Sequence, residues 1–290
     1  MKKTDGDSMK SRVQALTAEL EQQVQELFDS EKYRLFLDAM AKFHHYSWNN
    51  TLLILMQCPH AEQVAGYATW KKLGRQVKTG EKGIRILVPT PVKIRKTESA
   101  LQEEKEETVN EEKEQKLLFF KIGHVWDISQ TEGPPLPSIA VKELAGDVAA
   151  YSNLMKTVKR LSPVPIREGK IEGGAKGYFS PPRQEIVIRE GLSERHSFHT
   201  AVHELTHSLL NQRGIDKTID RQTNEVIAES VSYVVCKALK IETEEYSCGY
   251  ICGWSSGREM KELKTSLTLI RELADELIPA FQTEEKAEAS

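Results

Sequence analysis

The chain has 290 residues, of which 39% are hydrophobic and 29% charged, with a formal net charge of −3. This composition is typical of a soluble globular protein with room for two domains, and it excludes a chain that binds nucleic acid through its overall charge. No apolar run is long enough to span a membrane and the N-terminus lacks the apolar core of a signal peptide, so we expect a cytoplasmic protein with no membrane partner.

The first part of the chain is predicted to be mostly helical. We expect residues 1–10 to be disordered. Apolar residues at helical spacing then predict helices over 11–30 and 33–43. A short apolar helix over 52–56, ended by Pro59, and a helical turn over 67–73 follow.

A small sheet is predicted next. A Gly-punctuated stretch leads into a strand at 84–88, whose partner is predicted at 117–122, with a further strand at 125–128. Between them, residues 97–116 hold eight Glu against three Lys, so that three minus eight gives −5. We interpret this acidic loop as a solvated hairpin extension or a disordered segment. The alternative is that it screens the neighbouring basic surface.

Positive charge is concentrated between residues 43 and 96, where nine Lys and Arg minus two Glu give +7, and aromatic residues interleave with it. Single-stranded nucleic acid binds such a surface because phosphates meet cations while bases stack on rings. The alternative is that the rings are core residues and the basic face is only solvated. The candidate nucleic-acid-binding residues are Tyr46, Trp48, Asn49, Trp70, Lys71, Lys72, Arg75, Lys78, Lys82 and Arg85.

Several motifs of this region occur in the order found in ArdC-type antirestriction proteins: YSWNN at 46–50, WKKLGR at 70–75, KTGEKG at 78–83 and VWDISQT at 125–131. Residues 10 to 132 therefore resemble the N-terminal domain of that family. The resemblance implies a domain over 11–132 that binds single-stranded DNA, followed by a zincin-like metallopeptidase domain over 133–290. The Pro-rich stretch at 133–137 marks the predicted boundary.

The stretch His203-Glu204-Leu205-Thr206-His207 has the spacing of a zinc-hydrolase site. On a helix, His203 and His207 share a face and can bind one zinc ion, while Glu204 on the flank can take a proton from a water at the metal. An apolar stripe predicts such a helix, and Gly214 is placed to end it. The alternative is a chance match of two histidines flanking a glutamate.

A second predicted helix begins near Asp220, a candidate N-cap, and carries Glu225 and Glu229 on one face. A mono-zinc site needs three protein ligands and one open position, so Glu225 is predicted as the third ligand. Glu229 would then accept a hydrogen bond from a zinc-bound histidine and fix its orientation. The reverse assignment stays open, and so does the interpretation of both as exposed helix charges.

The run NEVIAE at 224–229 resembles the glutamate helix of gluzincins, and ImmA/IrrE-type families show a similar pattern. The stretches at 177–182 and 185–188 resemble the turn and edge strand that precede the active-site helix in those families. Such an edge strand could pair with an extended peptide substrate. The candidate oxyanion donors are Tyr178, His196, His199 and Tyr250, and the alternative for each of them is a structural role.

The predicted fold class is α+β in two domains. Helices surround a small twisted antiparallel sheet in the first, and the second has a zincin-like metallopeptidase fold. Two functions remain open: a zinc peptidase tethered to DNA that cleaves an unidentified protein substrate, or chiefly a protector of incoming mobile-element DNA from restriction with little peptidase activity. A further alternative is an ImmA-like metallopeptidase that cleaves a regulatory protein, with the N-terminal domain as a protein-interaction module.

Overall fold

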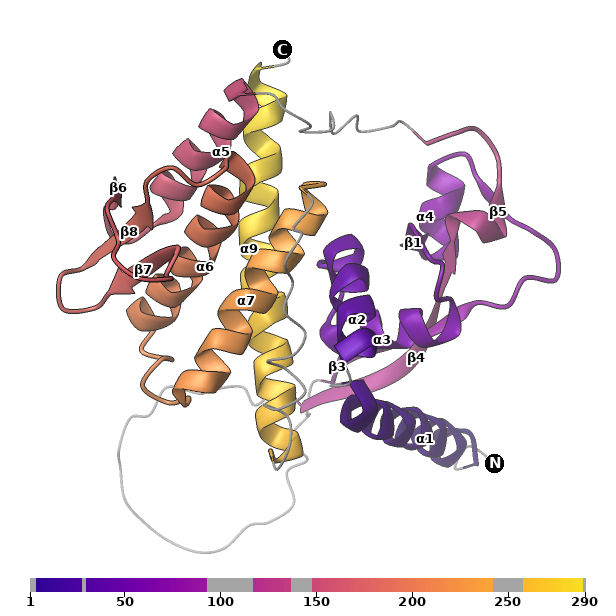
Figure 1. Cartoon of the computed structure of the whole chain (residues 1–290). Helices are drawn as coiled ribbons and strands as arrows, with labels where there is room; N and C mark the ends of the chain where they lie inside the picture. The colour runs from indigo at the N-terminus through magenta and orange to yellow at the C-terminus, as the bar shows by residue number, and fades with distance from the viewer. Residues whose placement is uncertain (1–3, 28–29, 93–116, 137–147, 242–257, 289–290) are drawn as a thin grey trace, which may run out of the picture.

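The computed structural model describes residues 4–27, 30–92, 117–136, 148–241 and 258–288 (Figure 1). The predicted acidic loop at 97–116 and the oxyanion candidate Tyr250 lie outside the described residues. Helices combine with small sheets, so the predicted α+β class is confirmed. The N-terminal elements are α1 (Thr4–Leu27), α2 (Ser30–Phe43), α3 (Trp48–Gln57), β1 (Val64–Ala65), α4 (Tyr67–Lys72), β2 (Gln76–Val77), β3 (Ile84–Val92), β4 (Leu117–Asp127), the 3-10 turn Ile128–Gln130 and β5 (Thr131–Glu132).

The C-terminal elements form one small sheet and a layer of helices. The sheet has the order β6 (Ile166–Gly169), β8 (Glu185–Arg189) and β7 (Gly177–Ser180), with β6 parallel and β7 antiparallel to β8. The strand predicted at an edge, β8, is therefore the central one, and part of the predicted turn before it is the edge strand β7. The described elements are α5 (Val148–Leu161), β6 (Ile166–Gly169), β7 (Gly177–Ser180), β8 (Glu185–Arg189), α6 (Glu194–Gln212), α7 (Arg221–Ala238) and α9 (Met260–Glu288).

One continuous hydrophobic core joins the two predicted domains. The α9 helix runs through the middle of the molecule, with α5 and α6 on one side and α2 and α3 on the other (Figure 1). Buried side chains of α1 to α3 pack in the same cluster as those of α7 and α9. The Tyr33 hydroxyl lies 3.0 Å from the Ser230 hydroxyl, and Trp48 Nε1 donates to Thr268 Oγ1 at 3.0 Å. The N-terminal helices therefore depend on the C-terminal ones for burial.

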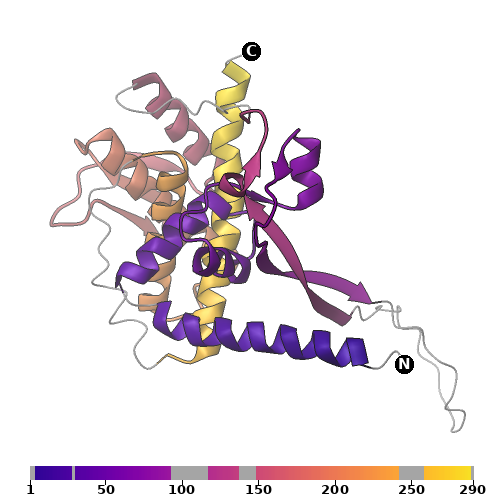
Figure 2. The same cartoon turned by 90° about the vertical axis from the view of Figure 1, so that its right-hand side faces the viewer.

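The N-terminal sheet is dominated by the β3–β4 hairpin, which projects outward from the helical body (Figure 2). β4 continues unbroken to Asp127, so the separate strand predicted at 125–128 is wrong. At its end the buried Asp127 carboxylate accepts hydrogen bonds from the backbone N–H groups of Glu62, Gln63 and Ser129. This carboxylate therefore ties the end of β4 to the segment that precedes β1.

The outer edge of β3 is covered by two side-chain amides of α3. Leu87 N–H donates to Asn50 Oδ1 at 2.8 Å, and Asn50 Nδ2 donates to the Leu87 carbonyl at 2.9 Å. Gln57 makes the same pair of bonds with Arg85, both at 3.0 Å. Asn50 and Gln57 lie two helical turns apart on one face of α3, so the helix takes the place of a neighbouring strand.

Two of three predicted helix ends are confirmed by the structure, and one is not. The Asp220 side chain accepts from Thr223 N–H and caps α7, and Gly214 at φ +68° follows the end of α6. The α1 helix, however, begins at Thr4, so residues 4–10 are helical where disorder was expected. No helix in the described ranges is long and apolar enough to cross a membrane.

Candidate metal centre

The structure brings His203 and His207 together on one face of α6. The opposite face of that helix is buried among apolar residues that include Val202, Leu205 and Leu209. This packing fixes the rotation of α6, and the i, i+4 spacing then turns both imidazoles toward α7. Glu225, in the second turn of α7, meets them there.

The three candidate ligand atoms converge on one point. His203 Nε2 and His207 Nε2 lie 3.0 Å apart, and Glu225 Oε2 lies 3.4 Å from the first and 3.6 Å from the second. Tetrahedral zinc with bonds of about 2.0–2.1 Å holds its ligands roughly 3.3 Å apart. These residues therefore fit a divalent metal ion with three protein ligands and an open fourth position.

Each imidazole is held by a second partner at its other ring nitrogen. His203 Nδ1 lies 3.2 Å from Glu229 Oε2, and His207 Nδ1 lies 3.0 Å from Asn224 Oδ1. Because an amide oxygen only accepts, His207 donates from Nδ1 and keeps a lone pair on Nε2 for a metal. No separate pattern in the sequence indicates the role of Asn224, although it is the residue before Glu225.

Hydrogen bonds among His203, His207, Glu225 and Glu229 shift the pKa values of His203 and Glu225. Burial alone would lower the pKa of His203, but its hydrogen bonds with Glu225 and Glu229 outweigh burial and raise that pKa to about 10. The same hydrogen bonds, from His203 and His207, hold the pKa of Glu225 well below its usual range. The two carboxylates thus favour a positive charge at this point, which is the electrostatic environment that a divalent cation requires.

Glu204 lies beside the histidines in a buried position, with 8% of its surface exposed. Burial raises the pKa of its carboxyl group, while a backbone N–H bond from Phe179 on β7 acts in the opposite direction. Strand β7 comes close enough to α6 for this contact because residue 177 is a glycine: a Cβ there would lie 2.6 Å from Thr200 Cγ2. A carboxylate with a raised pKa is suited to proton transfer near neutral pH.

All of these groups line one cavity of about 830 Å³ between β7, α6 and α7. Three of the predicted oxyanion candidates, Tyr178, His196 and His199, also line it. His199 Nε2 lies 3.1 Å from Ser232 Oγ, and His196 Nδ1 lies 2.8 Å from Ser193 Oγ, so each of these two rings already has a polar partner. The cavity combines a group of side chains that fits a metal ion, a buried carboxylate and an edge strand.

The predicted nucleic-acid-binding residues divide into buried and exposed sets. Trp48 and Trp70 are 8% and 2% exposed, and Trp70 Nε1 donates to the Trp126 carbonyl, so neither ring can stack on a base. Tyr46 is half-buried, and its hydroxyl donates to the Val64 carbonyl. Arg75 binds Thr131 and the carbonyls of residues 133 and 134, which gives it a structural role. The two tryptophan rings therefore belong to the core, as the alternative interpretation had it, while Tyr46 and Arg75 are partly exposed and each already has a hydrogen-bond partner within the chain.

The remaining cations are on the surface. Asn49 is half-buried, while five side chains are exposed: Lys71, Lys72, Lys78, Lys82 and Arg85. Helix α4, which carries Lys71 and Lys72, also carries Tyr67, one of the aromatic residues that interleave with the basic cluster in the sequence. Tyr67 is 51% exposed and meets Trp126 edge to face at 6.2 Å between ring centroids, and His124 lies 6.4 Å from Trp126. Tyr67 is thus an exposed ring on the same helix as two of these lysines.

Comparison with known proteins gives a domain match and a more distant relative. Residues 7–126 match the family model of the N-terminal domain of anti-restriction factor ArdC. The chain is also 28% identical over 272 residues to a Bacillus anthracis protein described as uncharacterized protein pXO2-81, with 82% of this chain covered. The alignment takes in 46% of that relative, so the chain spans about half the length of the curated protein it matches.

Two solved structures share the fold. The metal-free crystal structure of the antirestriction protein ArdC from plasmid R388 superposes with a TM-score of 0.55 at 19% identity, covering 82% of this chain and 86% of that one. The Mn(II)-bound structure of the same protein gives a TM-score of 0.51 at 19% identity, covering 81% and 89%. At this identity the likeness concerns the fold, which extends over both parts of the chain.

Proposed function

We propose that this protein is a zinc-dependent peptidase whose N-terminal region binds single-stranded DNA. The match of residues 7–126 to the N-terminal domain of ArdC and the ArdC-like fold of the chain support this proposal. In this proposal it protects incoming mobile-element DNA from restriction. The N-terminal region brings the protein to the DNA, and the centre between α6 and α7 acts on a protein substrate there.

The observation that carries the peptidase proposal is the convergence of three ligand atoms beside a buried carboxylate in one cavity. His203, His207 and Glu225 would hold the metal ion, and Glu229 and Asn224 fix the two imidazoles from behind. Imidazole and carboxylate ligands suit zinc, and an open fourth position is the mark of a catalytic rather than a structural site.

In the proposed reaction, the metal ion and the side chains of the protein have different roles. Bound zinc would supply polarisation of the scissile carbonyl and a lowered pKa for a water molecule. Glu204 accepts the proton of that water and later gives it to the leaving amine. The Phe179 N–H keeps the carboxylate turned into the cavity, and the edge strand β7 can hold an extended peptide by main-chain hydrogen bonds.

Glu204→Gln tests the peptidase proposal because it keeps the size of the side chain and removes the base. Zinc-loaded protein is incubated with an extract of host cells, and newly formed protein N-termini are labelled and identified. We expect cleavage products from the wild type and about 10²–10⁴-fold slower formation with Glu204→Gln. Glu194→Gln, an exposed position in the first turn of α6, is the matched control. Equal products from both variants would assign the cleavage to another protease.

The observation that supports DNA binding is the exposed group of cations around α4 and the loop before β3, with Tyr67 beside it. Cations track the phosphate backbone, and an exposed ring stacks on bases without regard to sequence. Because α1 to α3 share their core with α7 and α9, the test uses the full chain. Fluorescence anisotropy of a labelled oligo-dT should show binding that weakens steeply with salt; undetectable or salt-independent binding contradicts the proposal.

Transfer of unmodified DNA into a restricting host separates the two activities. If protection requires peptide hydrolysis, Glu204→Gln abolishes it and Glu194→Gln retains it. If protection survives Glu204→Gln unchanged, DNA binding alone accounts for it, and the centre serves another purpose.

A further inference from the structure

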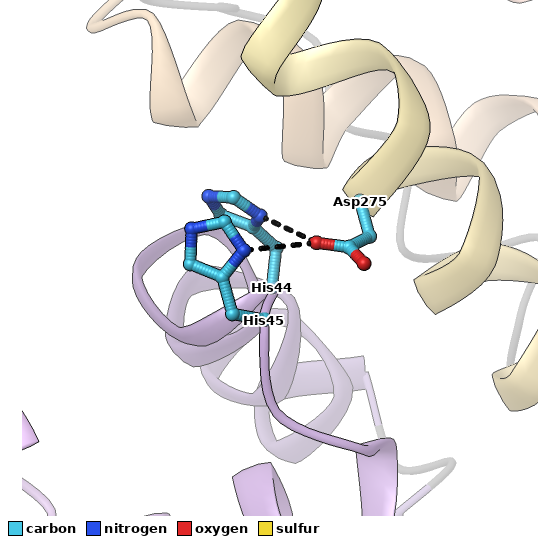
Figure 3. A group of neighbouring side chains, drawn as sticks. All are labelled: His44, His45 and Asp275. Carbon is cyan, nitrogen blue, oxygen red and sulfur yellow. Dashed lines mark hydrogen bonds and ion pairs between the residues drawn. The ribbon is translucent and has the colours of Figure 1, made fainter. Parts of the chain in front are cut away.

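A second group of side chains that could bind a metal ion shares no residue with the α6–α7 centre. His44 and His45 directly follow α2, and Asp275 lies on α9, 231 positions from His44. Both imidazoles turn toward the same carboxylate oxygen of Asp275 (Figure 3). This group connects the N-terminal helices to the long C-terminal helix.

The donor atoms are spaced as metal ligands. His44 Nδ1 lies 3.2 Å and His45 Nδ1 lies 3.0 Å from Asp275 Oδ1, and the candidate ligand atoms all lie within 4.8 Å of one another. Ligands of a tetrahedral zinc ion are roughly 3.3 Å apart. A cation could therefore enter with small movements of side chains.

The remaining oxygen of Asp275 is already held from its own helix. Arg271 Nη1 lies 3.4 Å from Asp275 Oδ2, one turn back along α9. This contact leaves Oδ1 for a cation and fixes the carboxylate. The guanidinium charge also opposes a nearby dication, so the affinity should be lower than at the α6–α7 centre, where the carboxylates of Glu225 and Glu229 both lie close to the imidazoles.

Burial differs among the three side chains in a way that suits a site at the surface. His44 has 7% of its side chain exposed, Asp275 33% and His45 70%. The first two are positioned by the fold, and the exposed His45 leaves a path for a hydrated ion.

We propose that His44, His45 and Asp275 form a second divalent-metal site that fastens the N-terminal helices to α9. Two imidazoles and one carboxylate are a donor set for Zn²⁺, Ni²⁺ or Cu²⁺ rather than for Mg²⁺ or Ca²⁺. A cation shared between segments that are distant in the sequence binds only the folded chain, so it stabilises the joint between the two parts.

The test uses the full chain with the first centre removed by His203→Ala and His207→Ala, so that its outcome does not depend on the proposed peptidase. The protein is stripped with a chelator, mixed with Zn²⁺ and measured by native mass spectrometry and thermal unfolding. We expect one zinc ion per chain and a Zn²⁺-dependent rise in Tm. Adding His45→Ala, at an exposed position, should abolish both effects.

Two further variants separate metal binding from simpler explanations. Asp275→Asn still accepts N–H bonds but loses the ligand charge, so zinc and the Tm rise should be lost while the metal-free Tm changes little. His124→Ala, at an exposed histidine outside both groups, should keep the zinc ion. The proposal is overturned if the starting variant binds no zinc, if zinc binding survives His45→Ala, or if His124→Ala removes the zinc ion. In each of these cases Asp275 would only accept hydrogen bonds from the two imidazoles.

Discussion

The α6–α7 centre and the cationic surface around α4 place their polar side chains in opposite ways. In the centre, His203 and His207 are less than one fifth exposed, and each has a partner at both ring nitrogens. On the surface, Lys71, Lys72 and Lys82 extend into solvent from a helix end and a loop. The first arrangement fixes atoms in space, whereas the second fixes only a charge density.

This difference follows from what each region would bind. A metal ion requires its ligands at defined distances, and those ligands are kept in place by neighbouring groups. A flexible polyanion follows any surface that offers enough cations, and it accepts changes in their exact positions. Substitutions should therefore have large and position-specific effects in the centre, and small, additive effects on the surface.

The largest expected effect distinguishes the two acidic residues of α7. Glu229→Ala removes the group behind His203 and should lower zinc affinity about 10–100-fold. Glu225→Ala removes the proposed third ligand and should lower zinc affinity further. Competition with a chromophoric chelator measures both affinities in the full chain. The opposite ranking would exchange the roles of Glu225 and Glu229.

The next effect separates the buried aromatic residues from the exposed one. Trp70→Ala should lower the free energy of unfolding by about 3–5 kcal/mol, because it leaves a large cavity in the packing of α4. Tyr67→Ala should change that free energy by no more than about 0.5 kcal/mol and weaken oligo-dT binding by about 1–3 kcal/mol. Denaturant unfolding and anisotropy give the two quantities. Weakened DNA binding by Trp70→Ala at unchanged stability would restore its ring as a base contact.

A smaller effect concerns Asp127, which is 1% exposed. Burial alone would raise its pKa, but hydrogen bonds from Ser129, Glu62 and Gln63 outweigh burial and lower it. A depressed pKa in the folded state means that this stabilisation is complete above about pH 4 and is lost as the pH falls through the folded-state value. Asp127→Asn should cost about 1–3 kcal/mol at pH 7.

Denaturant unfolding at several pH values checks the prediction for Asp127. The difference between the wild type and Asp127→Asn should shrink as the pH is lowered below about 4, near the pKa of an unperturbed aspartate. A difference that stays constant with pH would mean that the substitution acts through packing and not through the carboxylate charge.

The smallest effect is expected on the cationic surface. Each phosphate contact removed from a single-stranded complex should reduce the slope of log affinity against log salt by roughly 0.7. The changes in this slope caused by Lys71→Ala and Lys72→Ala should therefore be additive in the double variant. Lys156→Ala on α5, also exposed, should leave the slope unchanged. A loss of binding with either single lysine variant would instead indicate a site with fixed geometry.

The same contrast decides what the sequence could predict. Helical spacing placed His203, Glu204 and His207 because a buried apolar stripe determines which face of α6 turns outward. Asp220 and Gly214 marked helix ends through local chemistry that needs no tertiary contact. These features are determined within a few residues of the chain, and a pattern of that length predicts them.

Features that depend on distant packing were not predictable in this way. The burial of Trp48 results from α9, more than two hundred positions away, and β8 became central only because β6 pairs with it. Asn224 acquires its role from the position of His207 on another helix. The pairing of His45 with Asp275 likewise depends on the joint between α2 and α9.

The covering of β3 by α3 has a consequence for how molecules of this protein behave toward one another. An unpaired edge of nine residues is a template on which a second chain can add a strand and begin a fibril. The side chains of Asn50 and Gln57 accept the backbone N–H groups of Leu87 and Arg85 on this edge. The next two residues of β3 whose backbone nitrogens face the same edge are Pro89 and Pro91, which have no N–H to donate. The hairpin can thus reach far into solvent without recruiting copies of itself.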